Sequence, residues 1–355
     1  MTDAAWLVLE DGTVFAGRFV VRGRHDAGEV VFNTALTGYQ EIMTDPSYAG
    51  QMVVLTYPLI GNYGTAPAWA EWIRPAARAL LVHRAMPASH AQASWDLVQY
   101  CRRYDLTLVA DLDTRALTRH LRERGTLRGV LTDAGSDREA AVQRAHSVSL
   151  AGIVDTVSTP RPYELPADGP RVAVIDYGVK QSILDRLRAR GFALTVLPAR
   201  TTAEDLEHLD PDGVVLSNGP GDPADLTDRL DVVRLAVERY PTLGICLGHQ
   251  LVALALGGRT YPLKFGHHGS NHPVMDMRTG RVQITSHNHG YAVDRESLGP
   301  DLVVRFVNLH DQTVEGLEVK GRPVVTVQHH PEAGPGPHDA DFVFDEFERA
   351  VAEGA

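Results

Sequence analysis

The sequence predicts an α/β protein with two domains, a strand-rich first half followed by a second half built on a mainly parallel sheet. Its 355 residues suit two domains of roughly 100–200 residues each. Residues 155–170 hold four prolines without apolar periodicity, which is typical of a linker. After them, short apolar strands alternate with helical patterns, as in parallel sheets covered on both faces. We therefore expect domains at 1–154 and 171–355.

Short strands and one helix are expected in the first half. Residues 28–36 and 51–58 are β-branched segments bounded by Gly, Pro and Asp, and they predict strands. A helix is expected between residues 113 and 125, with an Asp or Thr cap and a terminal Gly. The residues expected on its apolar face are Ala116, Leu117, His120 and Leu121. Five arginines from Arg115 to Arg128 cover its other side, as a solvated surface or as an interface for an acidic partner.

From residue 171 onward the expected elements alternate between strand and helix. Strands are expected at 171–178, 192–199, 213–221 and 241–246. Helices are expected at 181–191, 202–209, 226–240 and 247–258. Four more strand-like segments, at 281–287, 301–308, 313–319 and 323–330, precede a last helix at 341–351. In such sheets ligands bind beyond the carboxyl ends of the strands.

Composition and charge exclude several classes of protein. At 44% hydrophobic and 22% charged residues, the chain is not disordered, collagen-like or a coiled coil. A formal charge of −11 leaves no global positive field to bind nucleic acid. There is no run of about 18 apolar residues and no signal-peptide pattern, so we expect a cytoplasmic protein with no membrane span. Cys101 and Cys246 are the two cysteines, which fits a reducing compartment.

Cys246 lies in LGICLGHQLV, where a predicted strand leads directly into a predicted helix. Gly244 and Gly248 flank it in a G-x-C-x-G pattern, the thiol version of a nucleophile elbow, in which small neighbours allow a strained turn. The amino end of a helix also favours a thiolate. The alternative is a small buried hydrophobic residue at a strand end, a common environment of free cysteine.

A second segment, VQHHPE, again predicts a strand that ends in polar residues at the same edge of the sheet. In an extended stretch Glu332 would face the same side as His330 and could orient its imidazole. Pro331 favours that extended shape for His330. A nucleophile, a base and an orienting carboxylate are the three groups that a thiol acyl transferase needs. By itself, His330 would be read as a surface histidine.

Backbone N–H groups for an oxyanion hole are also predicted. The residue after the nucleophile, Leu247, supplies one of them. The turn SNGPGDP can supply another from Gly219, and Gly219 and Gly221 would allow the backbone to approach a substrate closely. The alternative is an ordinary strand-to-helix turn that contains glycines for their dihedral angles.

The motifs GICLGHQ, LSNGPGDP and HHPEAGPGPHD together resemble the class I glutamine amidotransferases, which hydrolyse glutamine with a Cys-His-Glu triad. GEVVFNTALTGYQEIMTDPSYAGQ, DLDTRALTRHLRERG and KFGHHGSNHPV resemble the small-chain family of carbamoyl-phosphate synthase, over essentially the whole chain. The resemblance implies a strand-rich β/β/α N-terminal domain and a class I amidotransferase domain with a flavodoxin-like sheet.

The resemblance also implies functional residues. Cys246, His330 and Glu332 would be the triad. The glutamine pocket would comprise Ser47, Gly219, Gly221, Leu247, Gln250, Asn288, Gly290 and Tyr291. Ser47 belongs to the first domain, so this pocket is expected near the seam between domains. Three positions depart from the family pattern: Tyr291 and His329 where Phe is usual, and His287 where Gln is usual.

Seven histidines are dense enough to suggest a metal, namely His267, His268, His272, His287, His289, His329 and His330. A zinc site has three or four ligands of characteristic spacing, usually with a Cys or carboxylate, and no such spacing is present, so we expect no metal. None of the lysines Lys180, Lys264 and Lys320 lies in a phosphate-binding loop, so ATP must be used elsewhere.

The family resemblance implies a partner for this chemistry. The chain would be the glutaminase subunit of carbamoyl-phosphate synthase, without a cofactor of its own. It would pass ammonia through a tunnel to a large chain that uses ATP, Mg²⁺ and bicarbonate, for pyrimidine and arginine synthesis. The helix rich in arginine and the first domain are candidate docking surfaces.

Two other functions stay open. One keeps the triad but serves another pathway, as a different amidotransferase or a stand-alone γ-glutamyl hydrolase or peptidase; the first 150 or so residues argue against it, because such hydrolases need no extra domain. The other is a non-catalytic interaction protein, which would require a broken triad.

Overall fold

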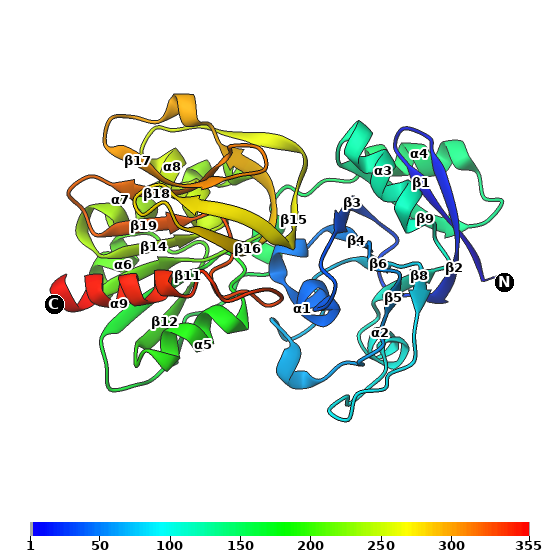
Figure 1. Cartoon of the computed structure of the whole chain (residues 1–355), viewed down its shortest axis with the longest axis horizontal. Coiled ribbons are helices and arrows are strands. Elements are labelled where there is room, and N and C mark those ends of the chain that lie inside the picture. The colour runs from blue at the N-terminus through cyan, green and yellow to red at the C-terminus, as the bar shows by residue number, and fades with distance from the viewer. Residues whose placement is uncertain (1–2, 355) are drawn as a thin grey trace. The chain divides into compact units, whose positions relative to one another are not determined.

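The structure is a computed structural model that describes residues 3–354, and the chain forms two compact units (Figure 1). The first unit contains the chain up to Leu150 together with Lys264–Gly269, and the second contains Ala151–Leu263 and the chain from Ser270 onward. The stretch expected as a linker, 155–170, falls in the second unit, and the domain limits expected from the sequence stay predictions. Within the described residues no helix is long and apolar enough to cross a membrane.

A closed barrel forms the centre of the first unit. In order around the barrel, its strands are β1 (Ala4–Leu9), β2 (Val14–Val21), β8 (Thr107–Ala110), β6 (Ala79–Leu81), β4 (Gln51–Leu55), β3 (Ala27–Asn33) and β9 (Leu127–Asp133). The strands predicted at 28–36 and 51–58 are β3 and β4. Closure was not foreseen, because it depends on antiparallel pairing of β1 with β9, segments far apart in the sequence. Two short strands outside the barrel, β5 (Leu59–Ile60) and β7 (Arg84–Ala85), pair with each other.

Alternation along a barrel strand places successive side chains in two different apolar clusters. Val53 and Leu55 of β4 pack in one cluster, whereas Met52 and Val54 pack in the other. Both faces of β4 are therefore buried.

The helices of this unit are α1 (Tyr39–Thr44), α2 (Leu97–Arg103), α3 (Thr114–Arg124) and α4 (Arg138–His146), with 3-10 turns at Pro46–Tyr48 and Pro67–Trp69.

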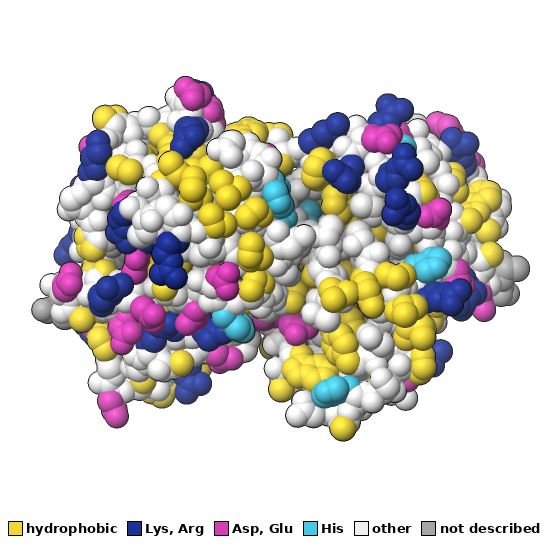
Figure 2. All heavy atoms as spheres, in the orientation of Figure 1, with side chains coloured by type: hydrophobic (Ala, Val, Ile, Leu, Met, Phe, Trp, Pro, Cys, Tyr) yellow, Lys and Arg dark blue, Asp and Glu magenta, His cyan; other side chains and the backbone are white. Residues whose placement is uncertain are grey.

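Helix α3 confirms the predicted helix and its caps. The Asp113 carboxylate accepts a hydrogen bond from the backbone of Ala116, and Gly125 ends the helix with a φ of 100°. Leu117 and Leu121 are buried as expected, but Ala116 is exposed, so the apolar face is narrower than predicted. The exposed arginines of this helix are Arg115, Arg119, Arg122 and Arg124. Figure 2 shows basic side chains gathered over this part of the first unit.

The second unit is built on a ten-stranded mixed sheet. Its five parallel strands, in spatial order, are β12 (Ala193–Pro198), β11 (Arg171–Asp176), β13 (Gly213–Leu216), β14 (Thr242–Ile245) and β19 (Val324–Val327). The other strands are β10 (Tyr163–Leu165) at one edge and β18 (Val314–Val319), β16 (Val282–Val293), β15 (Thr260–Asp276) and β17 (Leu302–Asn308) at the other. The sheet is more mixed than the mainly parallel sheet that we expected, and a flavodoxin-like arrangement stays a prediction.

Helices cover both faces of the parallel strands, as predicted. The helices are α5 (Gln181–Ala189), α6 (Ala203–Leu209), α7 (Leu230–Arg239), α8 (Leu247–Ala255) and α9 (Phe342–Gly354), with 3-10 turns at Ile153–Thr156, Pro223–Arg229 and Arg295–Ser297. Helices α6, α7 and α8 share one apolar cluster with Ala173 and Ile175 of β11, whereas α5 and α9 share the other with Val172 and Val174 (Figure 1). Adjacent residues of β11 thus face opposite layers.

Helix α7 is shorter than predicted. The sequence pattern favoured one helix at 226–240, but a 3-10 segment occupies Pro223–Arg229 and the α-helix begins at Leu230. Leu226 has non-helical dihedral angles, φ −110° and ψ 18°. Asp222 caps the 3-10 segment through the backbone N–H of Ala224, so the apolar periodicity continues across a change of helix type.

Candidate active site

Cys246 stands at the sharp turn between β14 and α8, as the sequence predicts. Its φ of 52° and ψ of −102° are unusual for a residue other than glycine. A Cβ on Gly248 would lie 2.1 Å from the carbonyl oxygen of Leu216, so only glycine lets α8 pack this closely on β13. The backbone N–H of Cys246 donates to the Val327 carbonyl at 2.8 Å. The turn is therefore held on both sides by neighbouring strands.

The Cys246 thiol is buried and has polar neighbours. It donates to the backbone oxygen of Asn288, with Sγ 3.7 Å from that oxygen, and the Gln328 amide nitrogen donates to Sγ at 3.6 Å. Gln250 joins Gln328 to Tyr291, because its amide nitrogen donates to Gln328 Oε1 at 3.0 Å and to the Tyr291 carbonyl at 2.9 Å. Sequence reasoning missed Gln328, which directly precedes the two histidines of the second motif.

His330 and Glu332 form a buried pair. The distance between His330 Nδ1 and Glu332 Oε1 is 2.7 Å, and the backbone N–H of His330 donates to the Ser286 carbonyl. The extended geometry expected between them is wrong beyond His330, since Ala333 N–H donates to the His330 carbonyl and closes a turn. Pro331 sets the φ of the second position of this turn. The carboxylate still reaches the imidazole, but around a turn rather than along a strand.

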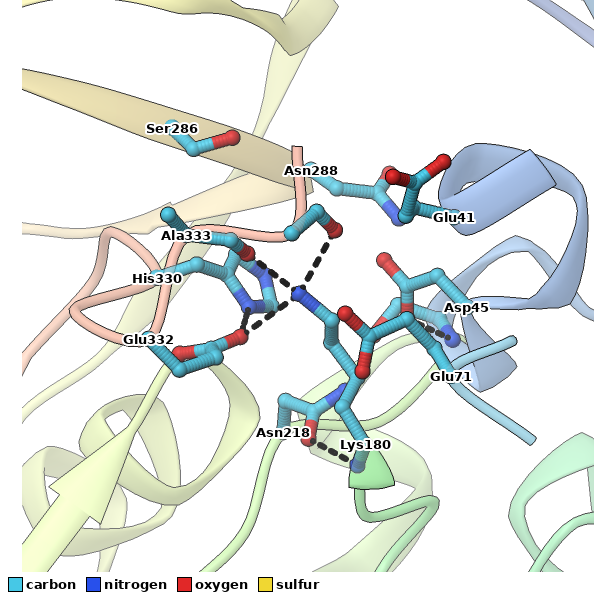
Figure 3. A network of polar contacts seen from close by, with 12 residues as sticks. Glu41, Asp45, Glu71, Lys180, Asn218, Ser286, Asn288, His330, Glu332 and Ala333 are labelled. Atoms are coloured by element: carbon cyan, nitrogen blue, oxygen red, sulfur yellow. Dashed lines mark hydrogen bonds and ion pairs between the residues drawn. The ribbon is translucent and has the colours of Figure 1, made fainter. Parts of the chain in front are cut away.

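Lys180 forms an ion pair with Glu332 of this pair, from another part of the sheet. It follows β11 and is the N-cap residue of α5, and its Nζ lies 2.8 Å from Glu332 Oε1 (Figure 3). The same ammonium donates to the carbonyl oxygens of Ala333 and Gly334, at 2.5 and 2.9 Å. The sequence analysis noted Lys180 for lacking a phosphate-binding loop and missed this role. A lysine just beyond the end of a buried parallel strand was the available signal.

Charge in this cluster shifts the pKa values of its members in opposite directions. Burial by itself would raise the pKa of Glu332, but the positive charges of Lys180 and His330 hold it well below its ordinary value. Burial would lower the pKa of His330, but Glu332 and Cys246 raise it above its ordinary value. The arrangement favours an ionised Glu332 beside a protonated His330, with Lys180 balancing the carboxylate.

Several residues expected in the glutamine pocket lie around Cys246 in the second unit. Leu247 is the first residue of α8, and a Cβ on Gly219 would lie 2.8 Å from its Cδ2 and 2.4 Å from the Tyr177 carbonyl oxygen. Gly221, in the same turn, has a φ of 90°. Asn288, Gly290 and Tyr291 lie on β16. The turn that contains Gly219 thus packs against Leu247, the residue that follows the thiol. An oxyanion hole made of their backbone N–H groups stays a prediction.

Ser47 belongs to the first unit. It lies in the 3-10 turn Pro46–Tyr48, is buried, and donates its backbone N–H to Asp45 Oδ1 at 2.9 Å. Its place in a glutamine pocket stays a prediction.

His329 is buried between an aromatic ring and other histidines. Its ring packs edge-on against Phe306, with ring centroids 5.7 Å apart, and neither ring nitrogen has a hydrogen-bond partner within the described residues. Burial and the charge of His330 lower its pKa to about 3. His329 is therefore neutral and packs as an aromatic ring, as would the Phe that the resemblance leads us to expect at this position.

Comparison with known proteins found two family matches along the chain. Residues 173–350 match the model of the family "Glutamine amidotransferase class-I", and residues 7–131 match that of "Carbamoyl-phosphate synthase small chain, CPSase domain". Between them they cover most of both compact units.

Three relatives are similar over nearly the full length. The "Carbamoyl phosphate synthase small chain" of Symbiobacterium thermophilum is 51% identical over 349 residues, 96% of each chain. That of Listeria monocytogenes serovar 1/2a is 48% identical over 344 residues, 96% of this chain and 95% of the relative. The "Carbamoyl phosphate synthase pyrimidine-specific small chain" of Lactiplantibacillus plantarum is 46% identical over 345 residues, 96% of this chain and 94% of the relative.

Proposed function

This chain belongs to the carbamoyl phosphate synthase small chain family, and on that premise we propose that it hydrolyses L-glutamine to glutamate and ammonia. The resemblance drawn from the motifs is confirmed, as is a mixed α/β fold with a class I glutamine amidotransferase domain. The observation that carries the proposal is Cys246 at a strained strand-to-helix turn, in one buried cluster with the His330–Glu332 pair.

In the proposed reaction the Cys246 thiolate attacks the side-chain amide carbon of glutamine. The backbone N–H groups of Leu247 and Gly219 stabilise the tetrahedral oxyanion, and His330 protonates the departing ammonia. Water, activated by His330, then hydrolyses the γ-glutamyl thioester and releases glutamate. Glu332 orients the imidazole and stabilises its protonated form. The residues that would bind glutamine are Ser47, Gly219, Gly221, Leu247, Gln250, Asn288, Gly290 and Tyr291.

A large-chain partner follows from the same proposal. Ammonia made at Cys246 has to be consumed, and the sequence contains no phosphate-binding loop for ATP. We propose that a carbamoyl phosphate synthase large chain receives the ammonia and uses ATP, Mg²⁺ and bicarbonate, while this chain needs no cofactor for the hydrolysis. Carbamoyl phosphate would then supply pyrimidine and arginine synthesis in the cytoplasm. The exposed arginines of α3 are a candidate docking surface.

The test compares ammonia release from glutamine by the purified chain and by Cys246→Ser, with and without the large chain. We expect release by the wild type that rises with the partner and is abolished in the variant. Free ammonia should still support synthesis by the complex that contains Cys246→Ser. Cys101→Ala, which changes the buried cysteine of the first unit, is the matched control.

Other outcomes favour the competing functions. Ammonia release that does not change when the large chain is added would favour a stand-alone hydrolase. Binding of the large chain without any release of ammonia would favour a non-catalytic regulator. Loss of ammonia-dependent synthesis in Cys246→Ser would mean that the change damages the complex rather than the hydrolysis alone.

A further inference from the structure

Three buried side chains of the second unit bring donor atoms together beside the Cys246 site. His287 and His289 lie on β16, and Glu315 lies on β18, the neighbouring strand of the sheet. Residues two apart on a strand face the same side, so both imidazoles project toward Glu315. Nδ1 of His287 is 3.1 Å from Nε2 of His289 and 3.6 Å from Oε2 of Glu315. All three atoms lie within 4.8 Å of one another.

The hydrogen bond at the far side of His289 determines its tautomer. Its Nδ1 is 2.8 Å from the carbonyl oxygen of Tyr291. A carbonyl oxygen can only accept, so Nδ1 carries the proton. In neutral His289 the lone pair is therefore on Nε2, the nitrogen that faces His287 and Glu315.

The tautomer of His287 is also fixed by hydrogen bonds, in this case through the Thr285 hydroxyl group. Its Nε2 is 2.7 Å from the Thr285 hydroxyl oxygen, and that hydroxyl donates its one hydrogen to the His272 carbonyl at 2.9 Å. The hydroxyl oxygen must then accept from His287, so Nε2 carries the proton. The lone pair of neutral His287 is on Nδ1, which faces His289.

Two nitrogen lone pairs and a carboxylate oxygen thus point into one small buried space. A cation that lies among these donors, either a proton or a metal ion, is attracted by all three of them. The 3.6 Å separation of His287 Nδ1 and Glu315 Oε2 exceeds the roughly 2.7–3.2 Å of an N–H···O bond. A proton on His287 would therefore not join these two residues by a hydrogen bond.

The separations fit the ligands of a single metal ion. Ligand atoms in a tetrahedral zinc site, each about 2.0–2.1 Å from the metal, lie about 3.3 Å from one another. The separations of 3.1 and 3.6 Å lie on either side of this value. We propose that His287 Nδ1, His289 Nε2 and Glu315 Oε2 bind a zinc ion, with water or another group as the fourth ligand.

The neighbours of these residues are those that zinc ligands usually have. Each imidazole donates its remote N–H to an oxygen, and the second carboxylate oxygen of Glu315 accepts from the Asn308 amide at 3.0 Å. The expectation of no metal rested on ligand spacing along the sequence, and Glu315, which lies on an adjacent strand, has no such spacing to the two histidines.

The zinc ion would have a structural consequence for β16. It would tie this strand to β18, and β16 also holds Asn288, whose carbonyl oxygen is 3.7 Å from Cys246 Sγ. The proposal concerns metal binding and does not depend on the proposed glutamine hydrolysis. Its test therefore uses metal content and thermal unfolding, which are independent of activity.

The experiment starts from the full chain, stripped with a chelator and then titrated with zinc chloride. After removal of excess metal, we expect one equivalent of zinc per chain by elemental analysis and a higher unfolding temperature. His287→Gln, which introduces the residue usual in the family, and Glu315→Gln should each weaken zinc binding at least tenfold and abolish the thermal shift. His310→Gln is the matched control, because His310 is an exposed histidine whose ring lies near His272 and it supplies none of the three donors.

Two results would overturn the proposal. One is a wild-type chain that retains no zinc and whose unfolding temperature does not respond to it; a proton would then bridge the two imidazoles. The other is zinc binding of equal strength in His287→Gln, which would place the metal elsewhere among the histidines. If either variant fails to fold, cobalt(II) titration of the wild type decides, since a tetrahedral His₂Glu site gives visible absorption bands and adventitious surface binding does not.

Discussion

Lys180 Nζ lies 2.8 Å from Glu332 Oε1, and both side chains are almost completely buried. The same carboxylate oxygen is 2.7 Å from His330 Nδ1, so one oxygen lies between an ammonium and an imidazole. Buried charges persist only where they are paired and hydrogen-bonded. The position of the His330–Glu332 pair therefore depends on a lysine that follows a different strand of the sheet.

Lys180→Met should leave the Glu332 carboxylate with one fewer positive neighbour. Removal of one partner of a buried pair lowers the free energy of unfolding by about 3–5 kcal/mol. The pKa of Glu332 is lowered in the folded protein, so its contribution to stability is present above its ordinary value of 4.5 and is lost as the pH falls through the lowered value. In the variant the pKa of Glu332 is lowered less, so this contribution should be smaller and its loss should be complete at a higher pH.

Urea denaturation between pH 3 and pH 8 measures both effects. Lys320→Met is the control, because that lysine is exposed and its change should alter stability by at most about 0.5 kcal/mol. A Lys180→Met variant as stable as the wild type over this range would show that the ion pair does not contribute to folding.

Glu332→Gln should lower the pKa of His330, because the charge of Glu332 is the main contribution that raises it. The imidazole would then lose its proton at a lower pH, and it would also be oriented less well. We expect the rate of glutamine hydrolysis to fall by about 10²–10⁴-fold, as for other orienting carboxylates. NMR titration of labelled histidine gives the pKa, and Glu348→Gln, at an exposed position of α9, serves as the control. An unchanged His330 titration would exclude this role for Glu332.

Gly248→Ala tests the close packing of α8 on β13. The new Cβ would lie 2.1 Å from the Leu216 carbonyl oxygen and 2.7 Å from its carbonyl carbon, so backbone would have to move. Overpacking of this kind lowers stability by about 1–3 kcal/mol or more. Gly299→Ala, where no atom lies within 4 Å of the new Cβ, should change stability by about 1 kcal/mol at most. Equal unfolding temperatures of the two variants would contradict the observed packing.

The sequence predicted those helices and caps that depend on residues close to one another along the chain. The Asp cap and the terminal Gly125 of α3 are read directly from the sequence. The long strand β15 was not predicted and β16 was predicted only over its first half, because their residues are rich in Gly, His and Asn and lack strict alternation. Tertiary pairing rather than propensity makes them strands.

Site prediction had the same limit. Cys246 and Leu247 are adjacent in one motif, and His330 and Glu332 are close together in another, so a motif search finds them. Lys180 reaches Glu332 only because β11 and β19 lie in one sheet with β13 and β14 between them. No spacing along the chain encodes that contact, and the same reasoning applies to Glu315 beside His287.

Ser47→Ala tests whether the first unit contributes to glutamine binding. The backbone N–H of Ser47, rather than its hydroxyl, donates to Asp45, so that hydrogen bond of the 3-10 turn persists in the variant. Loss of one hydrogen bond to a charged substrate weakens binding by about 1.5–3 kcal/mol, or roughly tenfold or more in KM. Steady-state kinetics beside thermal unfolding separates the two effects. An unchanged KM would remove Ser47 from the pocket.

Gly290→Ala probes the expected pocket on β16 without a steric effect on the protein itself. No atom lies within 4 Å of the new Cβ, so the free chain has room for the methyl group and its unfolding temperature should change little. If glutamine binds against the backbone at Gly290, the methyl group occupies part of its space, and KM for glutamine should rise by about tenfold or more for a clash of at least 1.4 kcal/mol. Gly299→Ala again serves as the control, and KM should not change there. If Gly290→Ala also leaves KM unchanged, glutamine does not approach this part of β16, and Gly290 would be removed from the expected pocket.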